Sequence, residues 1–192
     1  MTTSPSINNS WSRVALRRIR SFPPAERKAV LDAIPEDTRG TIAGAKRSDY
    51  LPATHAVAVC EGLIGVIGTE RAVEFWETVV GDSYAGGLLE PLITKMRRDE
   101  LDFGLIGLAA DAWALSTRDC GKVGLAQSRD GKVRLEAQGL PDYVRDSAGI
   151  QAMFAGTLRA MLAFSKLRAS IEVSTDNADG SIAFELKLRA PS

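Results

Sequence analysis

Residues 54 to 67 hold the side chains that are best suited to chemistry in this chain. His55, the single histidine, stands there with Cys60 and Glu61 in an otherwise apolar run. Histidine is a common metal or haem ligand, a cysteine of low pKa is a nucleophile, and a carboxylate in apolar surroundings needs a bonding partner. Two interpretations stay open. Either Glu61 bonds an arginine at a helix edge while His55 caps the helix start, or these groups line an internal pocket.

Two tryptophans further along the chain allow the same pair of interpretations, as core aromatics or as pocket walls. A pocket would bind a ligand without catalysis. The alternatives are a haem or metal sensor that uses His55, and a pocket enzyme that acts through Cys60 or Glu61. The candidate ligand-binding residues are His55, Cys60, Glu61, Trp76 and Trp113.

The familiar catalytic and metal-binding motifs do not fit the sequence. The three glycines between residues 62 and 68 lack the G-x-G spacing of a dinucleotide fingerprint. Residues 81–86 miss the spacing of a nucleophile elbow by one position. The segment from residue 175 resembles half of a calcium loop, but its twelfth position falls on Leu186. We therefore name no catalytic residue, no metal ligand and no cofactor, with haem as the alternative.

Three helices are expected to position the candidate residues. The run 54–67 is apolar on nearly every side, and its length favours a buried helix over a strand. A helix that Thr69 can cap carries Trp76 on its apolar face and ends near residue 81. A third helix begins near residue 101 and places Trp113 beside its apolar stripe.

The last third of the chain reads as two β-hairpins with an amphipathic helix between them. Apolar and polar residues alternate before and after the loop at 176–180, and a similar pattern surrounds residues 129–131. The sequence therefore predicts an α+β fold, in which helix-rich N-terminal two-thirds pack with a four-stranded antiparallel sheet in ββαββ order. The helix between the hairpins should face the sheet with Ile150, Met153, Phe154, Thr157, Leu158, Met161 and Leu162.

One folded domain is expected over most of the chain. We expect residues 1–9 to be a disordered tail and residues 10–192 to be a single α+β domain. That domain should be mainly helical over 10–118 and sheet plus helix over 119–192.

The first helix of this domain could meet a partner. It has an aromatic end and a row of arginines, which is either a solvated face or a docking surface for an acidic partner or a membrane surface. Such a partner includes a second copy of the chain, and we expect a homodimer. The candidate partner-binding residues are Trp11, Arg13, Arg17 and Arg20.

Charge and composition argue against several classes of protein. The net charge is zero, although residues 8–47 hold nine Lys and Arg against four Asp and Glu. This balance argues against a dedicated nucleic-acid binder. No apolar run approaches the roughly 18 residues of a membrane span. The polar first ten residues do not read as a signal peptide, and two isolated cysteines suit a reducing compartment, so we expect a cytoplasmic protein.

Several segments together resemble a known family. They are Ala112-Trp113-Ala114-Leu115 with Arg118-Asp119-Cys120-Gly121, the step Gly139-Leu140-Pro141, the helix around Gly156-Thr157-Leu158, and the closing hairpin. Over residues 22–190 the chain looks like a family of uncharacterised proteins known mainly from myxobacteria. That family is similar to the fold shared by haem–nitric-oxide-binding domains, 4-vinyl-reductase-type domains and TRAPP vesicle-tethering subunits.

The resemblance implies an α+β domain that packs helices on an antiparallel sheet, is often dimeric and binds a ligand or a protein. It assigns no functional residue. With the motifs above, it leads us to expect a non-enzymatic binding or scaffold module, for a small apolar ligand or a partner protein, with a role in signalling.

Overall fold

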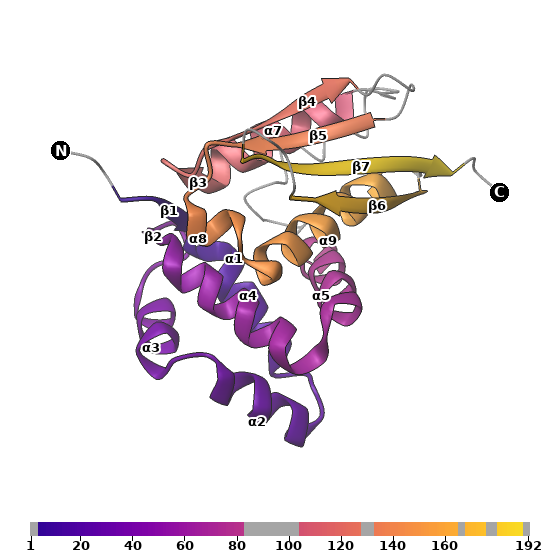
Figure 1. The fold of residues 1–192 in the computed structure, drawn as a ribbon. Coiled ribbons are helices and arrows are strands. Elements are labelled where there is room, and N and C mark those ends of the chain that lie inside the picture. The colour runs from indigo at the N-terminus through magenta and orange to yellow at the C-terminus, as the bar shows by residue number, and fades with distance from the viewer. Residues whose placement is uncertain (1–3, 83–103, 128–132, 165–167, 176–179, 190–192) are drawn as a thin grey trace.

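The computed structural model describes residues 4–82, 104–127, 133–164, 168–175 and 180–189. Helices from the first half of the chain form one layer, and four strands from the second half form another (Figure 1). The α+β class expected from the sequence is confirmed. Within the described ranges, no helix has the length and apolar character needed to cross a lipid bilayer.

Three short strands from distant parts of the chain form a small antiparallel sheet. They are β1 (Ser6–Asn8), β2 (Tyr50–Pro52) and β3 (Thr117–Arg118), in the order β2-β1-β3. The expectation of a disordered tail over residues 1–9 is wrong for β1. Both edges of this strand are paired, and Ile7 is buried. A polar segment can be ordered in this way when its backbone groups find partners on both sides.

The first helices start where capping groups or prolines favour a start. The side chain of Asn8 accepts a hydrogen bond from the backbone N–H of Ser10 at 3.0 Å, which caps the first helix. Proline precedes or opens the next three helices, where its fixed φ suits the first turn. The bounds are α1 Asn9–Ile19, α2 Pro24–Ala33, α3 Glu36–Gly44, α4 Ala53–Ile67 and α5 Thr69–Asp82.

The second half of the chain forms a four-stranded antiparallel sheet in the order β4-β5-β7-β6. Along the chain its elements run β4, β5, α8, α9, β6, β7, so a short helix that we did not expect, α8, precedes α9. Helix α7 leads into this part of the chain. The bounds are α7 Gly104–Ser116, β4 Lys122–Gln127, β5 Val133–Gln138, α8 Asp142–Arg145, α9 Ala148–Phe164, β6 Arg168–Ser174 and β7 Ile182–Arg189.

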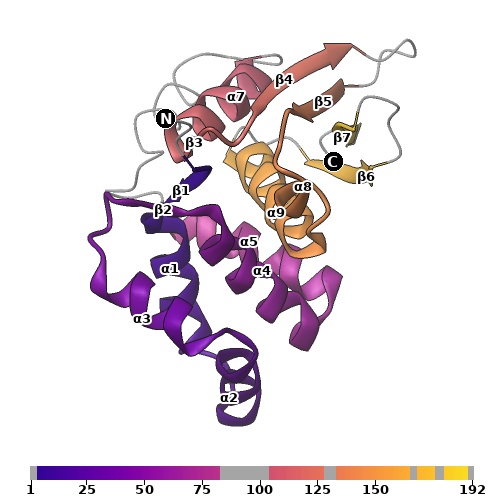
Figure 2. The same cartoon turned by 60° about the vertical axis from the view of Figure 1, so that its left-hand side comes forward.

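Helix α9 lies between the helical layer and the sheet, as the turned view makes clear (Figure 2). Two glycines let it approach its neighbours closely. A Cβ on Gly149 would lie 2.4 Å from the backbone of Cys60 in α4, and one on Gly156 would lie 2.4 Å from the backbone of Val73 in α5. The apolar face predicted for this helix is buried at Ile150, Met153, Phe154, Leu158, Met161 and Leu162.

The two faces of the four-stranded sheet differ in chemistry. Leu135 of β5 is paired in register with Phe184 of β7, and both are buried on the face toward α9. The opposite face carries ion pairs, among them Arg134 with Glu136 and Lys187 with Glu172. One covered face and one charged face are typical of an antiparallel sheet packed on helices.

Candidate functional site

The site begins with a cavity of about 50 Å³ between the N-terminal elements, α7, α9 and the four-stranded sheet. Strand β1 and helix α1 contribute one wall, α7 and α9 contribute two more, and β4, β5 and β7 close it. None of the described residues that line it is charged. They are Ile7, Trp11, Ala109, Ala112, Trp113, Ser116, Val123, Leu135, Met153, Phe154, Thr157, Leu158, Met161 and Phe184.

Three aromatic rings in contact form much of one wall. The ring centroids of Trp113 and Phe154 lie 4.6 Å apart, and those of Phe154 and Phe184 lie 5.2 Å apart. The indole N–H of Trp113 donates to the backbone carbonyl of Cys120 at 3.1 Å, which fixes the orientation of the ring. The cavity therefore has a rigid aromatic side.

Polar atoms in the cavity wall fall into two kinds. The hydroxyl of Thr157 donates to the backbone carbonyl of Met153 at 2.8 Å, so this group is satisfied within its own helix. In contrast, Nε1 of Trp11 and Oγ of Ser116 are buried without a hydrogen-bond partner. Buried polar groups are nearly always paired in folded proteins, so these two atoms need an explanation.

Of the residues singled out in the sequence, the cavity brings together Trp113 and Trp11. Trp11 was expected on a partner-binding surface, but it lines the interior beside β1. Trp76 is buried at 2% exposure in α5, where its ring meets Phe75 edge to face at 5.5 Å. It is thus a core aromatic outside the residues that line the cavity.

His55 faces another helix. Its Nδ1 lies 3.1 Å from the hydroxyl oxygen of the buried Thr38, which belongs to α3. It does not cap α4, because the helix begins at Ala53 after Pro52 with no side-chain cap. Residue 55 is also outside the residues that line the cavity.

Cys60 is buried in the contact between α4 and α9, with its sulfur 4.0 Å from that of Met153. Burial, with a smaller contribution from the neighbouring Glu61 charge, raises the pKa of the Cys60 thiol far above its ordinary value. A thiol with a raised pKa remains protonated at neutral pH, and only the thiolate is a good nucleophile. Cys60 is therefore placed as a packing residue.

Glu61 lies beside Cys60 but points to the start of α9. Its carboxylate accepts hydrogen bonds from the hydroxyl of Ser147 and from the backbone N–H of Gly149, the latter at 2.9 Å. Ser147 and Gly149 are thus the partners of Glu61, whereas one interpretation of the sequence had expected an arginine. Ser147 in turn accepts from the backbone N–H of Ile150 at 3.0 Å. Glu61 is thus a helix-capping group.

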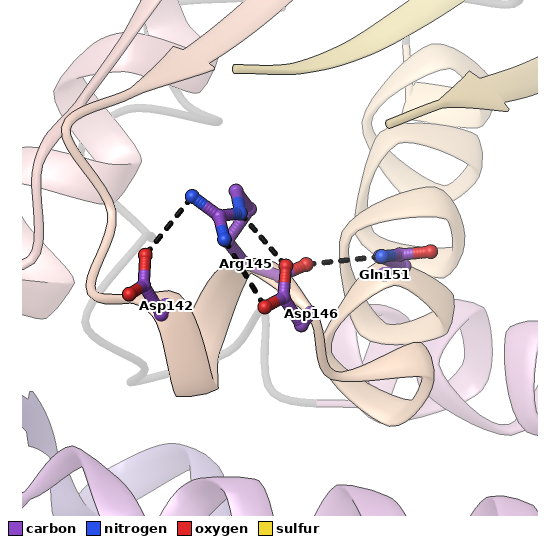
Figure 3. Close-up of polar contacts among 4 residues, drawn as sticks. All are labelled: Asp142, Arg145, Asp146 and Gln151. Atoms are coloured by element: carbon purple, nitrogen blue, oxygen red, sulfur yellow. Dashed lines mark hydrogen bonds and ion pairs between the residues drawn. The ribbon is translucent and has the colours of Figure 1, made fainter. Parts of the chain in front are cut away.

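A small ion-pair cluster holds the junction between α8 and α9 (Figure 3). The guanidinium of Arg145 bonds Asp142 at 2.9 Å and Asp146 at 2.7 Å. The side chain of Gln151 donates to the backbone carbonyl of Arg145 at 3.0 Å. The hydrogen bond from Arg145 lowers the pKa of Asp146. The ion pairs lie within α8 and its C-terminal cap, and the Gln151 hydrogen bond joins this cluster to α9.

Arg13 and Arg17 of α1, with Arg20 just after the helix, line a separate groove. A guanidinium nitrogen of Arg13 donates to the backbone carbonyls of Ala43 and Ala45, whereas Arg17 and Arg20 are exposed. The groove is lined by Arg13, Leu16, Arg17, Arg20, Ile42 and Ala43. Of the four expected partner-binding residues, the three arginines meet here, and Trp11 is in the interior.

No group of three or more His, Cys, Asp or Glu that could hold a metal ion occurs among the described residues. A haem ligand would be expected to come from the cavity wall, and the described residues that line it include two methionines but no histidine or cysteine. The residues present therefore do not fit a histidine-ligated haem.

Comparisons with known proteins place the fold. The solved structure of a variant H-NOX protein from K. algicida in its unliganded Fe(II) form is similar with a TM-score of 0.61 and 10% identity, over 95% of this chain and 97% of that one. An H-NOX protein from S. oneidensis in the Fe(II)NO state is similar with a TM-score of 0.58 and 9% identity, over 95% and 99%. The chain has the fold of H-NOX domains.

No protein-family model matches the chain, and no curated protein matches it in sequence. The haem–nitric-oxide-binding part of the expected resemblance is confirmed at the level of the fold. The myxobacterial family, the 4-vinyl-reductase-type domains and the TRAPP subunits stay predictions.

Sequence reasoning missed most of the cavity wall. Phe154 and Leu158 were expected to face the sheet, but nothing in their spacing indicated an opening beside them. Ile7 was missed because it stands in a polar segment. The signal that could have found it is the alternation of Ser6, Ile7 and Asn8 ahead of a helix cap.

Proposed function

We propose that the protein is a non-enzymatic binding module that takes a small apolar ligand into the cavity between α1, α7, α9 and the sheet. The observation that carries this proposal is the cavity itself, with its uncharged and mainly aromatic and aliphatic wall. Ligand sites are typically apolar and concave, with a few polar groups. An H-NOX-like fold supports a role in signalling, because ligand occupancy could shift α9 and the elements packed on it.

The wall chemistry supports binding over catalysis. General acid–base catalysis needs a titratable side chain within hydrogen-bond reach of the substrate. The described residues that line the cavity offer hydroxyl and indole groups but no histidine, carboxylate, lysine or cysteine. The two alternatives for an enzyme, Cys60 and Glu61, are engaged in packing and helix capping.

The fold likeness favours a second candidate, a haem-based sensor. The similar proteins from K. algicida and S. oneidensis were solved in Fe(II) states. Two observations weigh against it. His55 is bonded to Thr38 away from the cavity, and a cavity of about 50 Å³ is far below the roughly 300–1,000 Å³ of pockets for larger ligands. We therefore place a haem-independent module first.

Two measurements on the full chain decide between these candidates. Xenon is an uncharged probe that enters small apolar cavities. Under xenon pressure, the amide and methyl NMR signals of cavity residues such as Leu135 and Leu158 should shift. The signals of Ile34, which lies between α2 and α3, should not. An unchanged spectrum would remove the small-ligand proposal. When haem is added, we expect no Soret band from haem bound by a protein side chain. A Soret band that appears with the wild type and is lost in His55→Ala would establish the haem sensor.

We further propose that the groove on α1 contributes to a homodimer. Arg17 and Arg20 are exposed there, and the rest of the chain balances the positive charge of residues 8–47. The Debye screening length falls from about 10 Å at 0.1 M salt to about 3 Å at 1 M. Association through these charges should therefore weaken at high salt. Arg17→Glu should weaken it further, by about threefold or more, since like charges then face each other.

Sedimentation equilibrium measures this association at both salt concentrations. Arg47→Glu is the matched control, because Arg47 is exposed and lies outside the groove. A monomer under every condition would remove the homodimer. A dimer that responds equally to both variants would remove this groove from the interface.

A further inference from the structure

Two of the residues that line the cavity each carry a buried polar atom without a hydrogen-bond partner. Nε1 of Trp11, in α1, and Oγ of Ser116, at the end of α7, are buried without a hydrogen bond, and both residues line the cavity. Ser116 is only 5% exposed. An unsatisfied buried polar group costs about 1–3 kcal/mol, so two in one cavity are a notable cost for a domain of this size.

Two other polar side chains that line the cavity, in contrast, have hydrogen-bond partners. Thr157 lines the same cavity, but its hydroxyl donates to Met153. Trp113 also lines it, but its indole N–H donates to Cys120. The cavity therefore has two tryptophans and two hydroxyl groups, and one of each kind is left without a partner.

The chemistry of the two free groups specifies what could satisfy them. An indole N–H is a donor only, so its partner must bring an acceptor. A serine hydroxyl can donate to the same acceptor, because a carbonyl oxygen has two lone pairs. The described residues that line the cavity include no charged side chain that would balance an ion, and a buried unpaired charge is very costly.

The size of the space limits the ligand further. The cavity is about 50 Å³, whereas a cavity of about 150 Å³ holds benzene. Met153 and Met161 line it and can move aside more easily than branched side chains. A ligand of a few non-hydrogen atoms fits this space.

We infer that the cavity binds a small uncharged molecule with an apolar body and one carbonyl-type acceptor oxygen, held by the indole N–H of Trp11 and the hydroxyl of Ser116. The aromatic wall contacts the apolar body. This inference rests on the proposed function and deepens it, since it names the class of ligand for the same site.

Acetone and 2-methylpropene make a suitable pair of probes, because they share a shape and differ in the acceptor oxygen. The chain has three tryptophans, so its ¹⁵N-labelled form gives three indole N–H signals, which single Trp→Phe variants assign. Acetone should move the Trp11 signal downfield as a hydrogen bond forms. The Trp76 indole, which is also without a partner but outside the lining residues, is the internal control.

The variants separate the acceptor contact from the rest of the site. The ratio of the acetone Kd to the 2-methylpropene Kd should rise by about threefold to tenfold in Ser116→Ala and in Trp11→Phe, the loss expected for one hydrogen bond. Thr157→Val is the matched control and should leave the ratio unchanged, because the Thr157 hydroxyl is engaged within α9.

Each outcome decides a different question. If both probes bind and the ratio stays the same in Ser116→Ala and Trp11→Phe, the carbonyl assignment is overturned while the small-ligand function stands. If 2-methylpropene binds and acetone does not, the carbonyl assignment is likewise overturned and the small-ligand function stands. If neither probe nor xenon enters, the proposed function and this inference fail together. A changed ratio in Ser116→Ala alone would support the assignment even where Trp11→Phe does not fold.

Discussion

The carboxylate of Glu61 in α4 accepts a hydrogen bond at 2.9 Å from the backbone N–H of Gly149, in the first turn of α9. Glu61 thereby supplies a cap from one helix to another. A carboxylate near a helix N-terminus satisfies an N–H that has no partner inside the helix and interacts favourably with the helix dipole. The contact joins α4 to the first turn of α9, whose later turns line the cavity.

Glu61→Ala is expected to lower the free energy of unfolding by about 0.5–2 kcal/mol, the usual cost of losing a cap. Urea denaturation measures it. Glu74→Ala in α5 is the control, because Glu74 is exposed in the middle of its helix, away from the helix N-terminus. Equal effects of the two substitutions would show that the contact with Gly149 contributes nothing.

Gly149→Ala should destabilise the fold by about 1–3 kcal/mol or more, since the added Cβ would lie 2.4 Å from the Cys60 backbone. Gly65→Ala in α4 is the matched control, because a Cβ there meets nothing within 4 Å. That substitution should stabilise the helix by about 0.5–1 kcal/mol. Thermal denaturation of both variants tests this opposite pair of signs, and a stabilising Gly149→Ala would contradict the close packing of α4 on α9.

Leu158→Ala should cost about 2–5 kcal/mol, because Leu158 is 7% exposed and lines the cavity. The same change should enlarge the cavity and strengthen binding of a larger apolar probe such as benzene, which calorimetry can follow. Leu115→Ala, at a leucine that is 44% exposed, should stay within about 0.5 kcal/mol. A small effect at Leu158 would place this face of α9 away from the core.

Stability should fall in alkaline solution because of the buried thiols. Burial raises the pKa of Cys120 from 9.0 to about 11. Above pH 9 the unfolded chain releases this proton while the folded chain keeps it, so the unfolded state is favoured as the pH rises. The contribution is complete below about pH 9 and is lost by about pH 11.

Urea denaturation at pH 8, 9 and 10 measures this slope. Cys120→Ala should reduce it, and Cys60 and Tyr143, whose pKa values are also raised by burial, should contribute to the remaining slope. An identical slope in Cys120→Ala would show that the Cys120 thiol titrates in the folded protein as it does in the unfolded chain.

Local periodicity was enough to predict the helices that carry continuous apolar faces. The spacing of Ile150, Met153 and Phe154 identified α9 and its buried face. The apolar run around Val59 identified α4. These predictions succeed because the pattern repeats within one element and needs no knowledge of distant partners.

The contacts of Trp11 and Glu61 could not be read from the sequence in the same way. Trp11 lines an interior cavity because β1 places the start of α1 against α7 and the sheet, and such long-range pairing leaves no local pattern. Glu61 bonds Ser147 and Gly149, which lie on another helix. The type of each residue was informative, but its partner was set by tertiary packing.

Strand β1 has a consequence for the order in which the chain can fold during synthesis. Ser6 is paired with Pro52 on one side and with Arg118 on the other. A ribosome releases Ser6 long before Arg118, and chain entropy opposes the closure of so long a loop. Pulse-labelled hydrogen exchange during refolding should therefore protect the Ile7 amide after those of α9, and simultaneous protection would contradict this order. We therefore expect the part of the cavity wall that Ile7 contributes to be completed late in folding.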